Sequence, residues 1–183
     1  MIYFIADTHF GHENIIRLCN RPFGNVTEMN SYMFQAWNAR VKDDDTVYII
    51  GDMAFRTHVD EAVKFISGLK GHKCLIKGNH DGRTLKNEAF RKLFDEVADI
   101  KSLALGNTRV IMCHYPICEW EGYFRGSYLV YGHIHNTTTT PAYKFMHGMD
   151  KALNAGADII HYTPATFEEL IRYNQEFKEM YPV

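Results

Sequence analysis

The chain is organised around six consecutive residues that follow a short apolar run: Lys77-Gly78-Asn79-His80-Asp81-Gly82. The apolar run at residues 74–76 predicts a buried strand, which ends where the polar residues begin. A protein core would have to satisfy every polar group of Asn79, His80 and Asp81. Asn, Asp and Gly also form turns, so the stretch alone fits a tight turn as well as a functional site. The remainder of the chain decides between the two.

Length and charge set the first limits on fold and function. The 183 residues predict one domain, residues 1–183, with a core large enough to need no disulfide or metal staple. The 20 basic and 22 acidic residues give a net charge of −2, and there is no basic run. This balance argues against long nucleic acid or an anionic membrane surface as the partner, and it leaves a nucleotide open.

The cysteines indicate a compartment. The four cysteines form no Cys-x-x-Cys pair, and two of them lie in apolar, strand-like runs. We therefore expect buried free thiols in a reducing cytoplasm. Residues 1–6 are too short for a signal peptide and lack its basic flank, so they predict a first strand. No apolar run reaches the length that crosses a bilayer, and we expect no membrane partner.

Strands alternate with helices in the first half of the chain. Apolar runs predict three strands, at residues 2–6, 46–50 and 73–76. Apolar periodicity predicts three helices, at residues 13–19, 27–41 and 59–69. Polar residues follow each strand: Asp7 and His9, then Asp52, then Asn79-His80-Asp81. Such alternation predicts a parallel sheet with its ligands at the carboxyl ends of the strands.

The second half predicts a helix at residues 85–94 and then shorter strands. Residues 102–105 and 108–113 flank Gly106-Asn107, which is a hairpin signal. Further strands are expected at residues 128–131 and 159–162. A final helix is expected from Thr166, with a capping box, to about residue 180. His114 follows one of these strands, and His133 and His135 follow another.

The residues at the strand ends are typical of a metal site. They comprise seven candidate ligands: Asp7, His9, Asp52, Asn79, His114, His133 and His135. Asp7 and His9 are two residues apart, as are His133 and His135, so in extended backbone each pair points the same way. His, Asp and Asn without thiolate suit Mn²⁺, Fe²⁺, Co²⁺, Ni²⁺ or Zn²⁺, whereas Ca²⁺ prefers oxygen ligands throughout. Seven ligands are too many for one tetrahedral ion and suit two ions that share a carboxylate.

Charge counting indicates the substrate class. Two divalent ions bring four positive charges, and Asp7 and Asp52 return two negative ones. A site with surplus positive charge and a metal-bound hydroxide suits a phosphate ester, with ions about 3.5–4 Å apart. Singly these residues are weak signals, because Asp7 could cap a helix and Asp52 could belong to a turn. The prediction rests on their combination: five junctions, each a predicted strand followed by ligand-type residues, occur in order along the chain.

The five junctions together resemble the calcineurin-like metallophosphoesterases, and in particular their small, compact branch of bacterial and phage phosphodiesterases. The matching motifs span residues 7 to 135: Asp7-Thr8-His9, Gly51-Asp52, Gly78-Asn79-His80-Asp81, His114 and Gly132-His133-Ile134-His135. The resemblance implies an α/β fold, a four-layer α/β/β/α sandwich of two mixed sheets flanked by helices. It also implies two divalent ions, with manganese the first expectation and iron, nickel, cobalt or zinc the alternatives.

The resemblance also implies a role for each motif residue. One ion would take Asp7, His9, Asp52 and His135, and the other would take Asp52, Asn79, His114 and His133, with Asp52 as the bridge. His80 would be the acid that stabilises or protonates the leaving oxygen, and Asp81 would orient it.

Substrate contacts are less well defined by the sequence. His12, Asn14 and either Arg17 or Arg21 follow the first ligands, and they fit substrate binding or an ordinary helix start. Arg125 fits a phosphate clamp or a surface arginine. The remaining histidines match no motif and are expected to be structural or exposed: His58, His72, His147 and His161.

The leading hypothesis is a metal-dependent phosphoesterase that hydrolyses a small phosphodiester or nucleotide-like substrate. The alternatives are a phosphomonoesterase, a dinucleoside-polyphosphate or pyrophosphate hydrolase, and a non-catalytic scaffold of the same fold. His80 argues against the scaffold, which has no use for a leaving-group acid. No prediction of oligomeric state is made.

Overall fold

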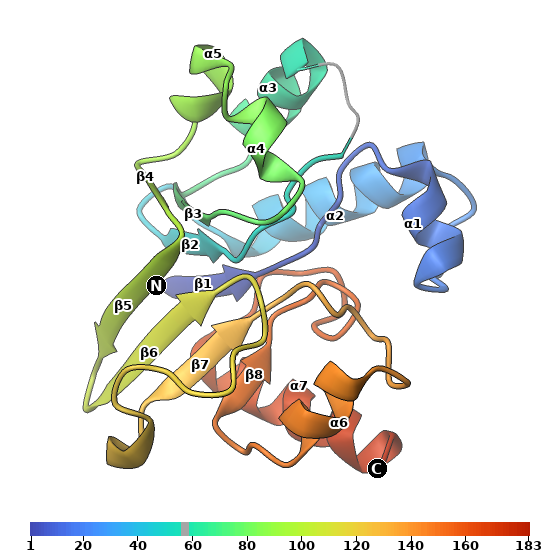
Figure 1. Ribbon diagram of the computed structural model, residues 1–183. Helices are drawn as coiled ribbons and strands as arrows, with labels where there is room; N and C mark the ends of the chain where they lie inside the picture. The colour runs from blue at the N-terminus through green and yellow to red at the C-terminus, as the bar shows by residue number, and fades with distance from the viewer. Residues whose placement is uncertain (56–58) are drawn as a thin grey trace.

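Apolar runs that end at glycine or polar residues form two four-stranded sheets. The structure, a computed structural model, describes residues 1–55 and 59–183 (Figure 1). The first sheet has the order β1-β2-β3-β4, and its strand pairs are all parallel. Its strands are β1 (Ile2–Ile5), β2 (Thr46–Ile49), β3 (His72–Ile76) and β4 (Glu96–Ala98). The carboxyl ends of β1, β2 and β3 therefore meet at one edge of this sheet.

The second sheet has the order β5-β6-β7-β8 and is mixed. Its strands are β5 (Ile100–Leu105), β6 (Thr108–Cys113), β7 (Tyr128–Tyr131) and β8 (Ala152–Asn154). The hairpin β5–β6 is antiparallel, as the Gly106-Asn107 signal predicts, and the other pairs are parallel. Both sheets were expected to be mixed. The second sheet combines parallel and antiparallel strand pairs, whereas the named strands of the first sheet pair only in parallel. In the first sheet, an antiparallel bridge joins Phe4 of β1 to Ala165, outside the named strands.

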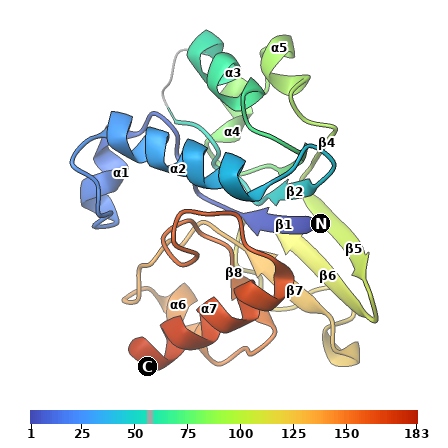
Figure 2. The same ribbon diagram turned by 180° about the vertical axis from the view of Figure 1, so that it is seen from behind.

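The sheets pack face to face, and helices cover their outer sides (Figure 1 and Figure 2). One buried cluster contains Phe4 and Leu75 of the first sheet together with Val110 and Leu153 of the second. The helices are α1 (Glu13–Leu18), α2 (Val26–Arg40), α3 (Val59–Ser67), α4 (Asp81–Thr84), α5 (Glu88–Arg91), α6 (Pro141–His147) and α7 (Phe167–Met180). The α/β sandwich fold class is therefore confirmed.

Local sequence signals explain how the long helices begin and pack. The side chain of Asn25 caps α2 by accepting from the Glu28 N–H, and Met29 and Trp37 bury the apolar stripe of this helix. At α7 both halves of the expected capping box form between Thr166 and Glu169. No helix in the described ranges is long and apolar enough to span a membrane.

Two predicted elements differ from the structure. The helix expected at residues 85–94 is replaced by α4 and α5, because the Asn87 side chain caps a new helix by accepting from the Phe90 N–H. The strand expected at residues 159–162 is wrong, because His161 and Tyr162 have φ of 56° and 60°, outside the strand region. The last strand is β8 instead.

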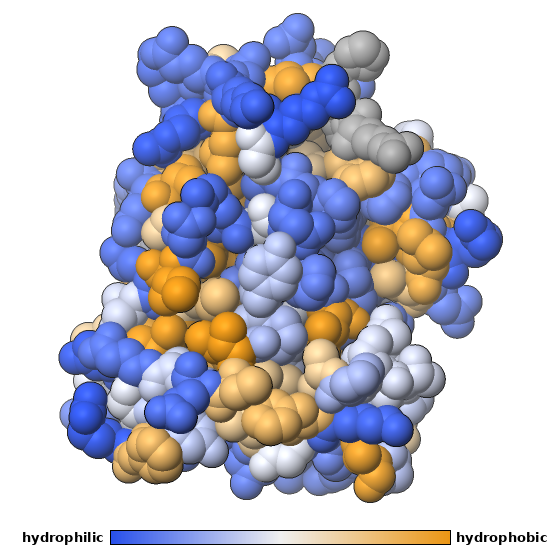
Figure 3. Space-filling view, in the orientation of Figure 1, coloured by the Kyte–Doolittle hydropathy of each residue, from blue (hydrophilic) through white to orange (hydrophobic). Residues whose placement is uncertain are grey.

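The face seen in Figure 3 is uneven in polarity. Hydrophilic residues cover α4 and α5, whereas apolar residues are more frequent over the second sheet. Among the exposed large apolar residues of the chain are Ile100 on β5 and Phe124 ahead of β7.

Candidate metal centre and active site

The loops that leave β1, β2, β3, β6 and β7 bring the seven ligand-type residues together. Backbone hydrogen bonds join these loops, from Asp7 N–H to Gly51 O (3.0 Å), His9 N–H to Asp52 O (3.0 Å) and Gly132 N–H to His114 O (2.9 Å). Five of the seven have positive φ, between 51° and 71°: Asp7, His9, Asp52, His133 and His135. Each such residue costs about 1–3 kcal/mol, and such strain clusters at functional sites.

Glycines in the motifs allow the loops to approach closely. A Cβ atom on Gly78 would lie 2.2 Å from Asp52 Oδ1, and one on Gly132 would lie 2.5 Å from Asp7 Oδ2. Real Cβ atoms essentially never come within 3.0 Å of such neighbours. These two glycines therefore set the positions of both carboxylates.

One group of ligand-type side chains consists of Asp7, His9 and His135, whose ligand atoms lie within 4.8 Å of one another. Asp7 Oδ2 accepts a hydrogen bond from the His133 N–H at 2.8 Å. Asp7 Oδ1 and both ring nitrogens of His9 are buried and have no hydrogen-bond partner within the described residues. Burial raises the pKa of Asp7 to about 6, and burial, then the nearby His135, lower the pKa of His9 to about 2. A bound cation would satisfy these buried acceptor atoms, which lack hydrogen-bond donors.

The second group consists of Asn79, His114 and His133. Asn79 Oδ1 lies 3.0 Å from His114 Nε2 and 3.0 Å from His133 Nδ1. His114 Nδ1 donates to Ile50 O at 2.8 Å, which leaves the lone pair of neutral His114 on Nε2. Burial lowers the pKa of His114. Its hydrogen bond to Asp52 and the charges of nearby carboxylates outweigh this effect, so the net pKa is raised above its ordinary value. A proton or a metal cation would satisfy these converging acceptors.

Asp52 lies between the two groups. Its Oδ2 is 3.8 Å from His9 Nε2 and 3.5 Å from His114 Nε2, while its Oδ1 accepts from the His80 N–H at 2.8 Å. Burial raises the pKa of Asp52, but the hydrogen bond and charge of His114 outweigh this effect and lower the pKa to about 2. Asp52 is therefore an ionised carboxylate that both groups can share.

The ordered motifs, the two sheets and this cluster agree with one family assignment. Residues 1–164 match the calcineurin-like phosphoesterase superfamily domain. The chain belongs to this superfamily. The protein is accordingly a phosphoesterase with a family requirement for divalent metal, and the residues present fit that requirement.

Similar proteins extend over most of the chain. An uncharacterised protein of Methanocaldococcus jannaschii is 32% identical over 178 residues, which cover 97% of this chain and 93% of the relative. The gene 66 protein of Mycobacterium phage L5 is 29% identical, and the match covers 73% of this chain and 77% of the relative. The crystal structure of a protein of unknown function from Aquifex aeolicus has a TM-score of 0.73 at 28% identity, and the match covers 94% of this chain and 98% of that one.

His80 lies at the open side of this phosphoesterase centre. Its Nε2 is 3.9 Å from Asp52 Oδ2, and its side chain is 38% exposed. The ring packs edge-on against Phe55, with centroids 4.6 Å apart. His80 therefore has both the exposure and the proximity to the shared carboxylate that a leaving-group acid requires.

Asp81 has a different role from the one expected. Its carboxylate accepts hydrogen bonds from the backbone N–H groups of Asp52 (2.8 Å), Met53 (3.1 Å) and Gly78 (2.8 Å). It is fully buried, and these three amides occupy both of its oxygens. The prediction that Asp81 orients the His80 ring is thus not met, because Asp81 instead ties the loop after β2 to the loop after β3.

Two aromatic rings flank the centre. Phe55 packs on His12 with centroids 3.8 Å apart, which brings His12 to the edge of the site. On the other side, Tyr115 packs on His133 at 4.7 Å and is 45% exposed. Sequence reasoning missed both aromatic residues, although each closely follows a motif residue.

Arg125 does not reach the centre, so its predicted phosphate contact is wrong. It ends the 3₁₀ helix η1 (Tyr123–Arg125) ahead of β7, whereas His133 follows β7. Arg125 lines a hollow with the hairpin turn Gly106-Asn107, at the opposite end of β6 from His114. At about 3.3 Å per residue, the six residues of β6 span about 20 Å.

The other expected contacts lie around the first helix. Asn14 and Arg17 are exposed on α1, and the Asn14 side chain forms no hydrogen bond within the described part of the chain. Arg21 is buried and bonded to Asp158, so it is no substrate contact. Of the histidines outside the motifs, His72 pairs with Asp95 and His147 contacts Lys178 O. His161 is exposed, and His58 lies outside the described residues.

Sequence reasoning missed Asp158. Its Oδ2 lies 2.9 Å from His135 Nδ1. Cys19, His135 and Asp158 also satisfy the 4.8 Å spacing of a metal group, but Arg21 and His135 already bond to the Asp158 oxygens. Asp158 follows β8 as the other site residues follow their strands, so a correct position for the last strand would have found it.

Proposed function

We propose that this protein is a two-metal phosphoesterase that hydrolyses small phosphodiester or nucleotide-like substrates. The observation that carries the proposal is that the seven ligand-type side chains form two adjoining groups with Asp52 between them, and that buried acceptors of Asp7 and His9 are left without donors in the described part of the chain. Asp7, His9, Asp52 and His135 would hold one ion, and Asp52, Asn79, His114 and His133 would hold the other. The mixture of imidazole, carboxylate and amide ligands suits Mn²⁺, Fe²⁺, Co²⁺, Ni²⁺ or Zn²⁺, and the family resemblance makes Mn²⁺ the first expectation.

When bound, the two ions supply a water of lowered pKa and positive charge for the phosphate oxygens. The chain supplies the proton: His80 donates it to the leaving oxygen as the bond between that oxygen and phosphorus breaks. Asp81 is a positioning residue, because it holds the backbone of Asp52 and Gly78 in place. General acid catalysis of this kind contributes about 10²- to 10⁴-fold.

Charge and aromatic residues support a small substrate. Asp7 and Asp52 leave two of four positive charges uncompensated, which suits an anionic phosphate ester. The half-exposed ring of Tyr115 beside His133 offers a stacking surface for an aryl group or a nucleobase. A net charge of −2 provides no field for a long nucleic acid.

Two further proposals concern the whole chain. Residues 165–183 lie beyond the family match, yet Phe167 packs on Phe4 and Asn174 bonds to Asn154 of β8, which supports one domain over residues 1–183. The four cysteines are free, which supports a reducing cytoplasmic compartment.

The test is hydrolysis of bis-p-nitrophenyl phosphate and p-nitrophenyl phosphate with and without Mn²⁺. We expect metal-stimulated turnover that is faster on the diester and is lost in Asp52→Asn. No stimulation on either ester would overturn the proposed activity. Equal or faster hydrolysis of the monoester would overturn the diester preference.

A further inference from the structure

We propose that the buried pair Arg21–Asp158 positions one ion site, that of Asp7, His9 and His135, and sets its affinity independently of the other site. This inference rests on the proposed two-metal function and adds two residues to it.

Arg21 and Asp158 form a fully buried, two-point ion pair. Arg21 Nε donates to Asp158 Oδ1 at 2.8 Å, and Nη2 donates to Oδ2 at 3.2 Å. Both side chains are 0% exposed, and Tyr162 lies on the guanidinium, 5.6 Å from its ring centroid. Replacing a buried ion pair by apolar residues is often neutral or stabilising, so stability alone is a poor reason for this pair.

Asp158 controls the orientation of His135. A carboxylate oxygen can only accept when ionised, so the bond at 2.9 Å puts the proton of neutral His135 on Nδ1 and leaves the lone pair on Nε2. The backbone of His135 is fixed as well, because Asn154 Nδ2 donates to its carbonyl oxygen at 2.9 Å. A metal-ligating histidine is ordinarily held in this way by a carboxylate behind it.

Arg21 controls the loop that carries Asp7 and His9. Its Nη2 donates to Asp7 O at 2.7 Å, and its Nη1 donates to Thr8 O at 2.9 Å. Asp7 and His9 have φ of 54° and 51°, a conformation that persists only where surrounding bonds hold it. One guanidinium thus holds the backbone of Asp7 and of Thr8, the residue before His9, and it holds His135 through Asp158.

The second group is linked to this pair only indirectly, through the His133 N–H that donates to Asp7 Oδ2 at 2.8 Å. His114 is held by Ile50 O, and His114 and His133 both contact Asn79. No hydrogen bond in the described part of the chain joins Arg21 or Asp158 to these residues. Loss of the pair should therefore weaken one ion and spare the other.

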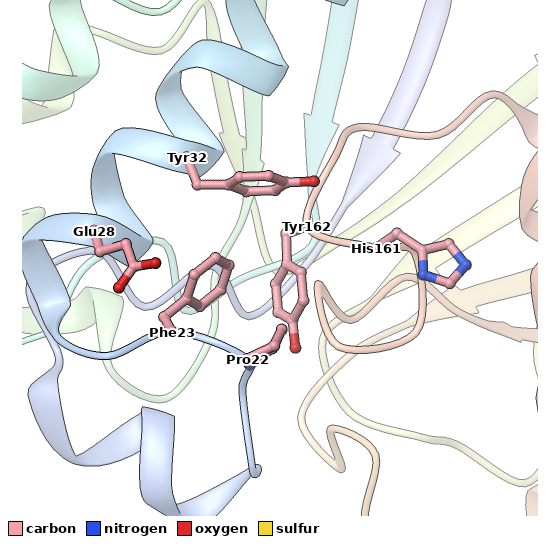
Figure 4. Close-up of a pocket in the computed structure, with 6 residues that line it drawn as sticks. All are labelled: Pro22, Phe23, Glu28, Tyr32, His161 and Tyr162. Atoms are coloured by element: carbon pink, nitrogen blue, oxygen red, sulfur yellow. The ribbon is translucent and has the colours of Figure 1, made fainter.

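On its far side, the network adjoins an open pocket of about 430 Å³ that Tyr162 lines with Phe23, Tyr32 and His161 (Figure 4). None of the seven ligand-type residues lines this pocket. Tyr162 contacts the Arg21 guanidinium and also lines this pocket, while the guanidinium donors are directed toward Asp158 and the loop after β1.

The test is calorimetric titration of Mn²⁺ into wild type, Asp158→Asn and the control Glu169→Gln. Asp158 has three N–H neighbours, two from Arg21 and one from His135, whereas the amide introduced by Asp158→Asn offers one acceptor oxygen and turns an NH2 group toward the rest, so Arg21 or His135 loses a hydrogen bond. We expect one of two sites to weaken about 10- to 100-fold in this variant, the usual effect of removing such a partner, and the other to change less than about 3-fold. The control removes the carboxylate of an ion pair with Arg40 and should retain both sites.

Each other outcome has a separate meaning. Unchanged affinity at both sites, or equal loss at both in a variant with wild-type circular dichroism, would overturn the inference. If Asp158→Asn does not fold, Arg21→Lys replaces it in the test. This variant keeps the positive charge but loses the two-point guanidinium bonding, and it must show the same selective loss of affinity. A wild-type protein that binds no Mn²⁺ would contradict the proposed function itself.

Discussion

Gly78→Ala tests how closely the loops of the site must approach. The new Cβ would lie 2.2 Å from Asp52 Oδ1 and 2.5 Å from Asp52 N, whereas ordinary contact begins at 3.4 Å. Asp52 would have to move by about 3.4 − 2.2 = 1.2 Å. Overpacking of this kind costs about 1–3 kcal/mol of unfolding free energy, and a misplacement of about 1 Å costs about 10²-fold in rate.

The assay pairs Gly78→Ala with Gly82→Ala, four residues along the same loop and helix. A Cβ on Gly82 meets nothing within 4 Å, and neither glycine has positive φ, so backbone strain does not separate the variants. We expect a lower melting temperature and slower Mn²⁺-dependent diester hydrolysis in Gly78→Ala, and wild-type values of both in Gly82→Ala. Wild-type activity and Mn²⁺ affinity in Gly78→Ala would refute the reasoning.

Three further predictions address the acid, the substrate and a surface ion pair. His80→Ala should keep both ions by elemental analysis but lose about 10²- to 10⁴-fold turnover on esters with poor leaving groups; loss of metal instead would contradict its role. Tyr115→Ala should raise KM for aryl or nucleotide esters by roughly 5- to 150-fold, because it removes about 1–3 kcal/mol of stacking. An unchanged KM would show that the Tyr115 ring does not bind the substrate. Burial raises the pKa of Glu169, but Arg40 lowers it below the ordinary 4.5. The pair therefore stabilises the fold above pH 4.5, by up to about 1 kcal/mol, and in chemical denaturation this difference from Glu169→Gln should disappear as the pH falls through the lowered pKa of Glu169 in the folded protein.

The sequence predicts those parts of the site whose signals are local. The strands that lead to Asp7, Asp52 and Asn79 are apolar runs that end before Asp7, Gly51 and Lys77, so the positions of these three ligands in the fold follow from the apolar pattern. The motif glycines also have a local signal, since each stands directly before a ligand.

Long-range contacts are what the sequence does not reveal. Asp158 lies 137 residues from Arg21 along the chain, and no spacing rule connects them. Ile159 and Ile160 are buried and β-branched but lie in a turn, so burial was mistaken for strand formation. The role of Asp81 depends on three amides, from Asp52, Met53 and Gly78, that only the folded loops bring together.

Diffraction at the manganese absorption edge from crystals soaked in Mn²⁺ tests the two-metal site most directly. The structure predicts two anomalous peaks in each chain, one on either side of the Asp52 carboxylate. Asp7, His9 and His135 should surround one peak, and Asn79, His114 and His133 should surround the other. A single peak, no peak, or a peak held by Cys19, His135 and Asp158 would contradict a dinuclear centre bridged by Asp52.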